Sequence, residues 1–168
     1  MVFNPRAGQP GPNTVGVTEL QDGAVSPIKL SDGAGASDAQ AANVNFSHTG
    51  LSRKRFERYE FYKDSGNKRN LKSLRIYHDL KADGTNQATL EIWLDNDGDW
   101  NGSDIYTGAG VADGKTDTIS ASFIDGFIDL DISGLANGKH VVNMAMLTNN
   151  AAGTADTTIR EYILDKSN

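Results

Sequence analysis

Cysteine is absent from the 168 residues of this chain, which excludes a disulfide framework, a thiolate metal site and a cysteine nucleophile. Long apolar runs are absent too. No run reaches the roughly 18 residues of a membrane-spanning helix, and the opening residues MVFNPRAGQPGPN lack the apolar segment of a signal peptide. We therefore expect a protein made and folded in a cytosol, with no membrane as a partner.

Charge is distributed unevenly along the chain, whose net charge is −6. Residues 1–51 carry −2, residues 52–81 carry +6 and residues 82–168 carry −10. The basic and acidic segments either pair across strands of one β domain, or form a basic face for an acidic neighbouring subunit. Direct nucleic-acid binding is not expected, because the domain is acidic overall and lacks a basic stripe interleaved with exposed aromatic residues.

The first 50 residues have the composition of an extended arm. Gly, Pro, Ala, Ser and Asn separate short apolar clusters, so ordering the segment costs backbone entropy and buries little apolar area. Pro27 disfavours both a long helix and a long strand around it. We predict an N-terminal attachment arm over residues 1–50. Its predicted anchors on a partner are Val25, Ile28, Leu30 and Phe46.

Within the arm, Asp22–Asp32, DGAVSPIKLSD, resembles a short segment of fibre and head-fibre proteins of tailed bacteriophages. The shared pattern is a glycine followed by Ala-Val, a hydroxyl residue, Pro and Lys-Leu. The resemblance implies a virion surface protein, commonly a homotrimer, with this segment near its base. It also implies that the major capsid protein or another virion protein is the docking partner.

From residue 51 onward the chain is rich in strand patterns. Residues 88–94, ATLEIWL, alternate cleanly between two faces, and no segment has a convincing helical period. Six further segments between Gly, Asn and Asp turns have strand composition: residues 55–62, 71–78, 118–124, 127–132, 140–147 and 158–164. These patterns predict an all-β fold: an antiparallel, jelly-roll-like β-sandwich over residues 51–168, preceded by the arm.

The most distinctive local signal is Asp95–Asp104, DNDGDWNGSD. Asp95, Asp97 and Asp99 have the spacing of the first ligands in a calcium-binding EF-hand loop. The match then fails, because Trp100 replaces the glycine of the turn and the closing glutamate is missing. Calcium as a cofactor therefore stands beside a plainer alternative, a solvated hairpin loop whose Asp and Asn side chains bond their own turn.

The same loop allows a second kind of ligand. An exposed Trp100 beside Asn101 and the carboxylates would form a platform for a sugar or a receptor. This alternative predicts a tail-fibre-type receptor- or glycan-binding module that uses the loop Asp95–Asp104.

No catalytic constellation is evident. Asp129 and Asp131 share one face of a strand, but their alternation with Ile and Leu is typical of a half-exposed strand and not of glycosidase acids. His48, His78 and His140 are scattered singly, with no metal-ligand spacing. There is also no G-x-S-x-G nucleophile elbow and no glycine-rich phosphate loop. We therefore expect no enzymatic activity.

The basic run Arg53–Lys63, RKRFERYEFYK, predicts a strand without a purely apolar face. Such a strand suits a sheet edge or a seam between subunits, where Arg and Tyr are favoured contacts. Arg53 and Arg55 are the predicted partner contacts of this strand. Trp93 either packs under a neighbouring strand or lies in a subunit interface.

Together these features predict a non-enzymatic structural protein of a phage virion, assembled in the host cytoplasm. The expected role is that of a cement-like capsid decoration or head-fibre subunit, which docks by its arm and displays the sandwich. The short chain favours this role over that of a whole tail fibre.

Overall fold

The computed structural model describes residues 38–64 and 70–165, and these residues form eight strands. The strands are β1 (Asp38–Thr49), β2 (Lys54–Lys63), β3 (Ser73–Ala82), β4 (Ala88–Leu94), β5 (Gly114–Thr118), β6 (Ile124–Asp131), β7 (Gly138–Thr148) and β8 (Thr154–Asp165). A single turn of 3-10 helix, η1 (Asp97–Asp99), lies between β4 and β5. In the described ranges no helix is long and apolar enough to cross a membrane.

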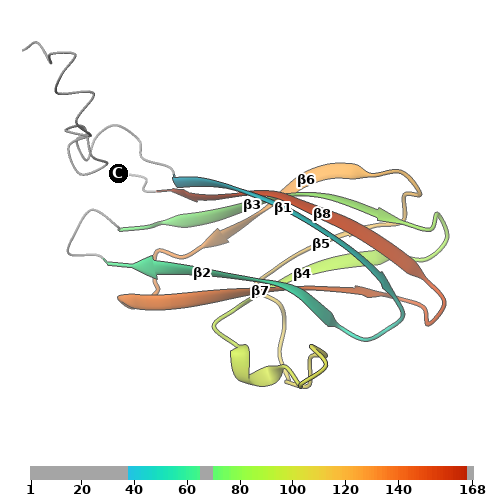
Figure 1. Cartoon of the computed structure of the whole chain (residues 1–168), viewed down its shortest axis with the longest axis horizontal. Coiled ribbons are helices and arrows are strands. Elements are labelled where there is room, and N and C mark those ends of the chain that lie inside the picture. The colour runs from blue at the N-terminus through green and yellow to red at the C-terminus, as the bar shows by residue number, and fades with distance from the viewer. Residues whose placement is uncertain (1–37, 65–69, 166–168) are drawn as a thin grey trace, which may run out of the picture. The chain divides into compact units, whose positions relative to one another are not determined.

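The strands form two four-stranded sheets, β1-β8-β3-β6 and β2-β7-β4-β5, which lie face to face (Figure 1). Every pairing between neighbours is antiparallel. Only the step from β4 to β5 stays within one sheet, and every other connection crosses to the opposite sheet. This is the strand order of a jelly roll. The predicted fold class, an antiparallel β-sandwich, is confirmed.

The hydrophobic core lies between the two sheets. Inward-facing residues alternate with half-exposed ones along β3, as expected for a strand with one buried face. Burial of each large apolar side chain stabilises the fold by roughly 1.5 to 3 kcal/mol before the cost of ordering it. The most deeply buried of these side chains are Leu74, Ile76, Leu80, Leu90, Ile92, Ile132, Val142, Met144, Met146 and Ile159.

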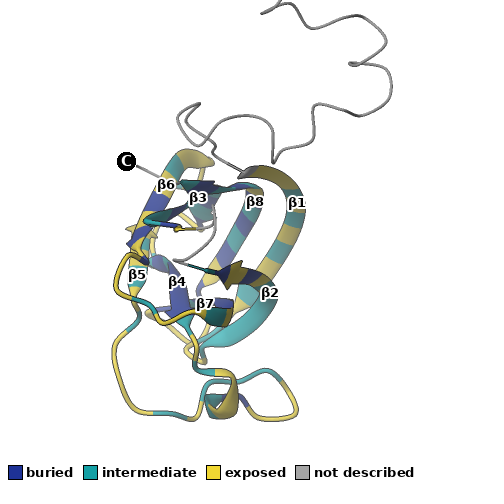
Figure 2. Cartoon of the chain, turned by 90° about the vertical axis from the view of Figure 1, so that its left-hand side faces the viewer, coloured by how far each residue is buried: buried dark blue, intermediate teal, exposed yellow. Residues whose placement is uncertain are grey.

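The sandwich begins earlier in the chain than the sequence predicts. β1 pairs with β8 along its length, and Phe46 stacks on Phe56 of β2 with ring centroids 4.7 Å apart. The predicted arm boundary at residue 50 is therefore wrong for residues 38–49. The strand was missed because β1 is an edge strand that alternates between exposed and half-buried residues (Figure 2), so its apolar signal is weak. The rest of the predicted arm, residues 1–37, lies outside the described residues.

β5 also differs from the prediction. The strand is Gly114–Thr118, where the sequence indicated a turn, and the predicted strand 118–124 is mostly the connection to β6. The reason is packing across the sandwich: a Cβ atom at Gly114 would lie 2.6 Å from Cγ2 of Ile128 and 2.9 Å from Cδ2 of Leu130. Glycine has a low strand propensity, but here close approach of the two sheets requires it.

The basic and acidic segments of the sequence pair within the chain. Ion pairs join the basic segment of residues 52–81 to carboxylates that come later in the sequence. They include Arg53 with Glu91 (2.7 Å), Arg55 with Asp104 (2.7 Å), Arg58 with Asp97 (2.5 Å), Arg75 with Asp129 (2.6 Å) and Lys81 with Asp156 (3.1 Å). Of the two interpretations of the charge pattern, pairing within one domain is thus confirmed.

Candidate functional site

The connection between β4 and β5, residues 95–113, folds over the outer face of the second sheet, below β4 and β7 in Figure 1. Trp100 of this loop packs on Trp93 of β4 and Ala145 of β7, and the three form a small apolar cluster outside the main core. Trp93 is only 3% exposed. Trp93 was predicted to pack under a neighbouring strand or to lie in a subunit interface. In the structure it is covered by the β4–β5 loop of the same chain.

Arg53 holds this loop against the sheet through Glu91 and two rings. Its Nε donates a 2.7 Å hydrogen bond to Oε2 of Glu91, a carboxylate that is buried on β4. Its guanidinium lies 5.7 Å from the ring centroid of Trp93 and 5.8 Å from that of Tyr106. A buried carboxylate requires such a cationic partner. Arg53 thus has a role within its own subunit, and its predicted contact with a partner stays a prediction.

Arg55 makes a second connection to the same loop. Its guanidinium donates to Oδ1 of Asp104 at 2.7 Å and to Oδ1 of Asn143 at 3.0 Å, and lies 5.4 Å from the ring of Trp100. Both predicted partner arginines thus serve the fold of one chain. Phe46, the predicted arm anchor, is likewise part of the sandwich, and the anchors Val25, Ile28 and Leu30 lie outside the described residues.

A β-bulge explains how β2 supplies two of the loop-binding arginines, Arg55 and Arg58. The pairing of β2 with β7 shifts between Arg55 and Glu57, so Arg55 and Arg58 face the loop together. Arg58 donates to Asp97 and Arg55 to Asp104. In a strand without a bulge, side chains alternate between the two faces, and Arg55 and Arg58 would lie on opposite faces. The predicted edge position of this strand is confirmed.

The predicted sugar platform requires an exposed Trp100, and this expected exposure is wrong. Trp100 is only 9% exposed, because its ring lies against Trp93, Tyr106 and the Arg55 guanidinium. Asn101 is exposed, but its Oδ1 accepts hydrogen bonds from the backbone N–H groups of two later residues and so shapes the turn. The sequence could not distinguish a displayed tryptophan from one that folds back.

The predicted calcium ligands Asp95, Asp97 and Asp99 do not form a common site. Asp95 accepts hydrogen bonds from His140 and from the backbone N–H of Val141. The carboxylate of Asp97 is bound to Arg58 and to Asn143, and the Arg58 hydrogen bond lowers its pKa. Within residues 38–64 and 70–165, no three acidic or histidine side chains gather in the manner of a metal site.

The histidines and the paired aspartates also have separate partners. His140 lies between Asp95 and the carbonyl of Ala136, with ring nitrogens 2.5 Å and 2.8 Å from the two acceptors. His78 is buried, and both of its ring nitrogens lack a hydrogen-bond partner. Asp129 is bound to Arg75 and Asp131 caps the backbone N–H of Ser133, so these two aspartates do not act as a pair.

Sequence reasoning missed an exposed apolar surface on the edge strand β6 and the connection before it. Ile119, Phe123, Ile124 and Phe127 are each at least half exposed there. We call the two rings that lie against Arg75 and Lys81 of β3, Phe123 and Phe127, the β6 strip. Phe127 packs beside Tyr77 of β3, and the Arg75 guanidinium lies 4.2 Å from the centroid of its ring. Phe, Tyr and Arg are enriched at protein interfaces. The signal in the sequence was the closely spaced apolar residues of ISASFIDGF.

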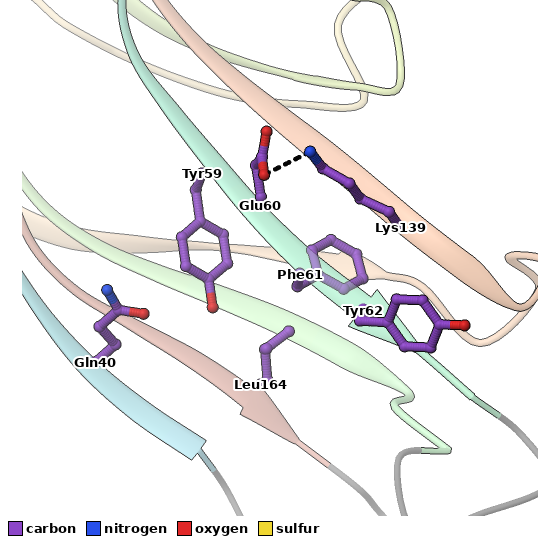
Figure 3. A pocket seen from close by; sticks show the side chains of 7 residues that line it. All are labelled: Gln40, Tyr59, Glu60, Phe61, Tyr62, Lys139 and Leu164. Atoms are coloured by element: carbon purple, nitrogen blue, oxygen red, sulfur yellow. Dashed lines mark ion pairs between the residues drawn. The ribbon is translucent and has the colours of Figure 1, made fainter.

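A second surface feature, the edge cleft, opens between the two sheets on the side where β1 and β2 are the edge strands (Figure 3). It has a volume of about 410 Å³. Its lining comes from four strands: Gln40 of β1, Tyr59, Glu60, Phe61 and Tyr62 of β2, Lys139 of β7 and Leu164 of β8. No local sequence pattern predicts this cleft, because its walls are brought together only by the packing of the two sheets.

The geometry therefore offers two surfaces, the β6 strip and the edge cleft, for contacts with other molecules. In the part of the chain that the structure describes, neither contains a catalytic arrangement of side chains. Comparison of the chain with protein-family models and with curated protein sequences finds no match.

Proposed function

We propose that this protein is a non-enzymatic structural subunit of a phage virion, of the capsid decoration or head-fibre type. The observation that carries the proposal is the segment Asp22–Asp32, DGAVSPIKLSD, which resembles fibre proteins and precedes the sandwich. The jelly roll itself serves many functions and supports no single one. In this proposal the spacer-rich segment serves attachment and the sandwich domain is displayed.

Attachment in this proposal rests on small apolar anchors. Val25, Ile28 and Leu30 would each contribute roughly 1 to 2 kcal/mol on burial against the partner, less the cost of ordering the segment. Single anchors of this size are weak, so several copies of the chain must act together for stable attachment. The partner is the major capsid protein or another virion protein.

The β6 strip is the surface of the sandwich best suited to contacts between copies of the chain. Its rings are exposed, and the neighbouring Arg75 and Lys81 contact them from the same sheet. A heterologous contact repeated by rotation closes into a ring, which is how a homotrimer would form. The paired charges of Arg75 and Asp129 beside the rings keep this surface close to neutral.

The test compares the full chain with a version that starts at Gly35, just before β1, and with a full-length Val25→Ser, Ile28→Ser, Leu30→Ser variant. Retention on particles stripped of this protein and mass by light scattering are measured. Loss of retention in both variants, with circular dichroism unchanged, supports the proposal. Equal retention of all three proteins would show that the arm is not the attachment device.

A further inference from the structure

The edge cleft combines an apolar floor with polar groups at its rim. Phe61 and Leu164 are almost fully buried and approach each other from opposite sheets (Figure 3). Gln40 pairs with the buried Tyr162 across β1 and β8, so its side chain points to the same side, between the sheets. An amide group is thus placed above a floor of rings and aliphatic carbon.

The opposite rim carries charges that cancel. Glu60 and Lys139 form an ion pair of 2.7 Å beside Tyr62, which is 53% exposed. Hydrogen bonds from Lys139 and Arg58 lower the pKa of Glu60, so the carboxylate is an acceptor at neutral pH. The rim therefore has donors and acceptors but no net charge to attract an ion.

We propose that the edge cleft binds a neutral saccharide. Ligand pockets of about 300 to 1,000 Å³ are typically lined by apolar and aromatic side chains with a few polar groups, and this cleft has that composition. The C–H faces of a sugar ring pack against aromatic rings, whose faces are electron-rich. Its hydroxyl groups both donate and accept, which matches the amide of Gln40 and the paired charges of Glu60 and Lys139.

Other occupants fit the lining less well. A purely apolar ligand would leave the amide and the ion pair without partners as it displaced their water. A charged ligand would find its counter-charge already neutralised by the partner in the ion pair. The inference concerns the sandwich alone, so it goes beyond the proposed attachment function and does not depend on the arm.

The experiment titrates isotope-labelled full-length protein with glucose, galactose, mannose, N-acetylglucosamine and their common disaccharides, followed by NMR. At least one sugar is expected to shift amide signals of β1, β2 and the end of β8. Gln40→Ala and Tyr62→Ala should each weaken that binding about tenfold or more. Leu51→Ala is the control, because Leu51 is a large apolar residue with 58% exposure that lies between β1 and β2 and outside the cleft.

The titration has one supporting outcome and three that would overturn the proposal. Shifts confined to the cleft, lost in Gln40→Ala and Tyr62→Ala and retained in Leu51→Ala, support the proposal. It is overturned if no sugar in the panel shifts the cleft signals, or if the shifts persist in both cleft variants. Shifts of the cleft that depend on protein concentration alone would assign it to a contact between copies, and would also overturn it. Because both cleft variants alter exposed side chains, unchanged thermal unfolding is the check that they fold.

Discussion

His140 and Asp95 form an ion pair, 2.5 Å between Nδ1 and Oδ2, that ties the start of the β4–β5 loop to β7. The other ring nitrogen of His140 lies 2.8 Å from the carbonyl oxygen of Ala136. Both nitrogens face acceptors, an arrangement that suits the doubly protonated imidazolium. The loop that covers Trp93 is thus anchored by an ionisable group.

The His140 pair predicts that stability falls as the pH rises. Burial acts to lower the pKa of His140, but the hydrogen bonds to Asp95 and Ala136 outweigh it, and the pKa is raised above its usual value. The stabilisation is complete below the unfolded-state pKa of about 6.5 and is lost as the pH rises through the higher folded-state pKa. Urea unfolding across this range should show a decline that His140→Gln removes. An unchanged decline in the variant would contradict the assignment.

His78 predicts the opposite dependence at lower pH. Burial lowers the pKa of His78, with smaller effects from Asp79, Arg160 and Asp125, so the folded state favours the neutral ring. Stability is complete above about pH 6.5 and falls as acid protonates the unfolded chain. His78→Leu should abolish this part of the acid sensitivity and stabilise the protein by about 1 kcal/mol, because two unpartnered buried nitrogens are removed. A loss of stability at neutral pH would indicate that the ring has a partner in solution.

Truncation of Trp100 to alanine should cause a large loss of stability. Trp100→Ala removes the side chain that packs on Trp93 and Ala145, and should destabilise the protein by about 3 kcal/mol. Guanidinium unfolding measures the effect. Val111→Ala is the control from the same loop, because Val111 is 85% exposed, and should change stability by less than about 0.5 kcal/mol. Equal effects of the two substitutions would mean that the loop does not pack on the sheet in solution.

We expect added calcium to have no effect on the melting temperature of the protein. The carboxylates of Asp95 and Asp97 already accept hydrogen bonds from His140, Arg58 and Asn143, and binding of a cation would have to break them. Differential scanning calorimetry with calcium and with a chelator should give the same melting temperature. A ligand that binds only the folded state raises that temperature, so a calcium-dependent rise would restore the predicted ligand set.

The course of most strands was determined by the sequence itself. Residues 88–94 alternate with period two and form β4 as predicted, because one face of the strand must be buried and side chains point to alternate faces. Gly, Asn and Asp punctuation placed most turns for the same local reason, since these residues accept turn conformations. Two strands, β1 and β5, were not predicted from the sequence. β1 lies at an edge with a weak apolar pattern, and β5 contains a glycine that only contact with Ile128 explains.

The site was decided by tertiary structure. The sequence established which residues could carry chemistry, among them Trp100, Arg53, Arg55 and the aspartates of residues 95–104, but not what they contact. A loop that folds back buries Trp100, and a bulge turns Arg55 and Arg58 to the same face. Neither event leaves a local pattern, since each depends on a surface built from strands that are distant in sequence. The edge cleft has the same origin: Gln40 and Phe61 line one cavity only because two sheets pack face to face.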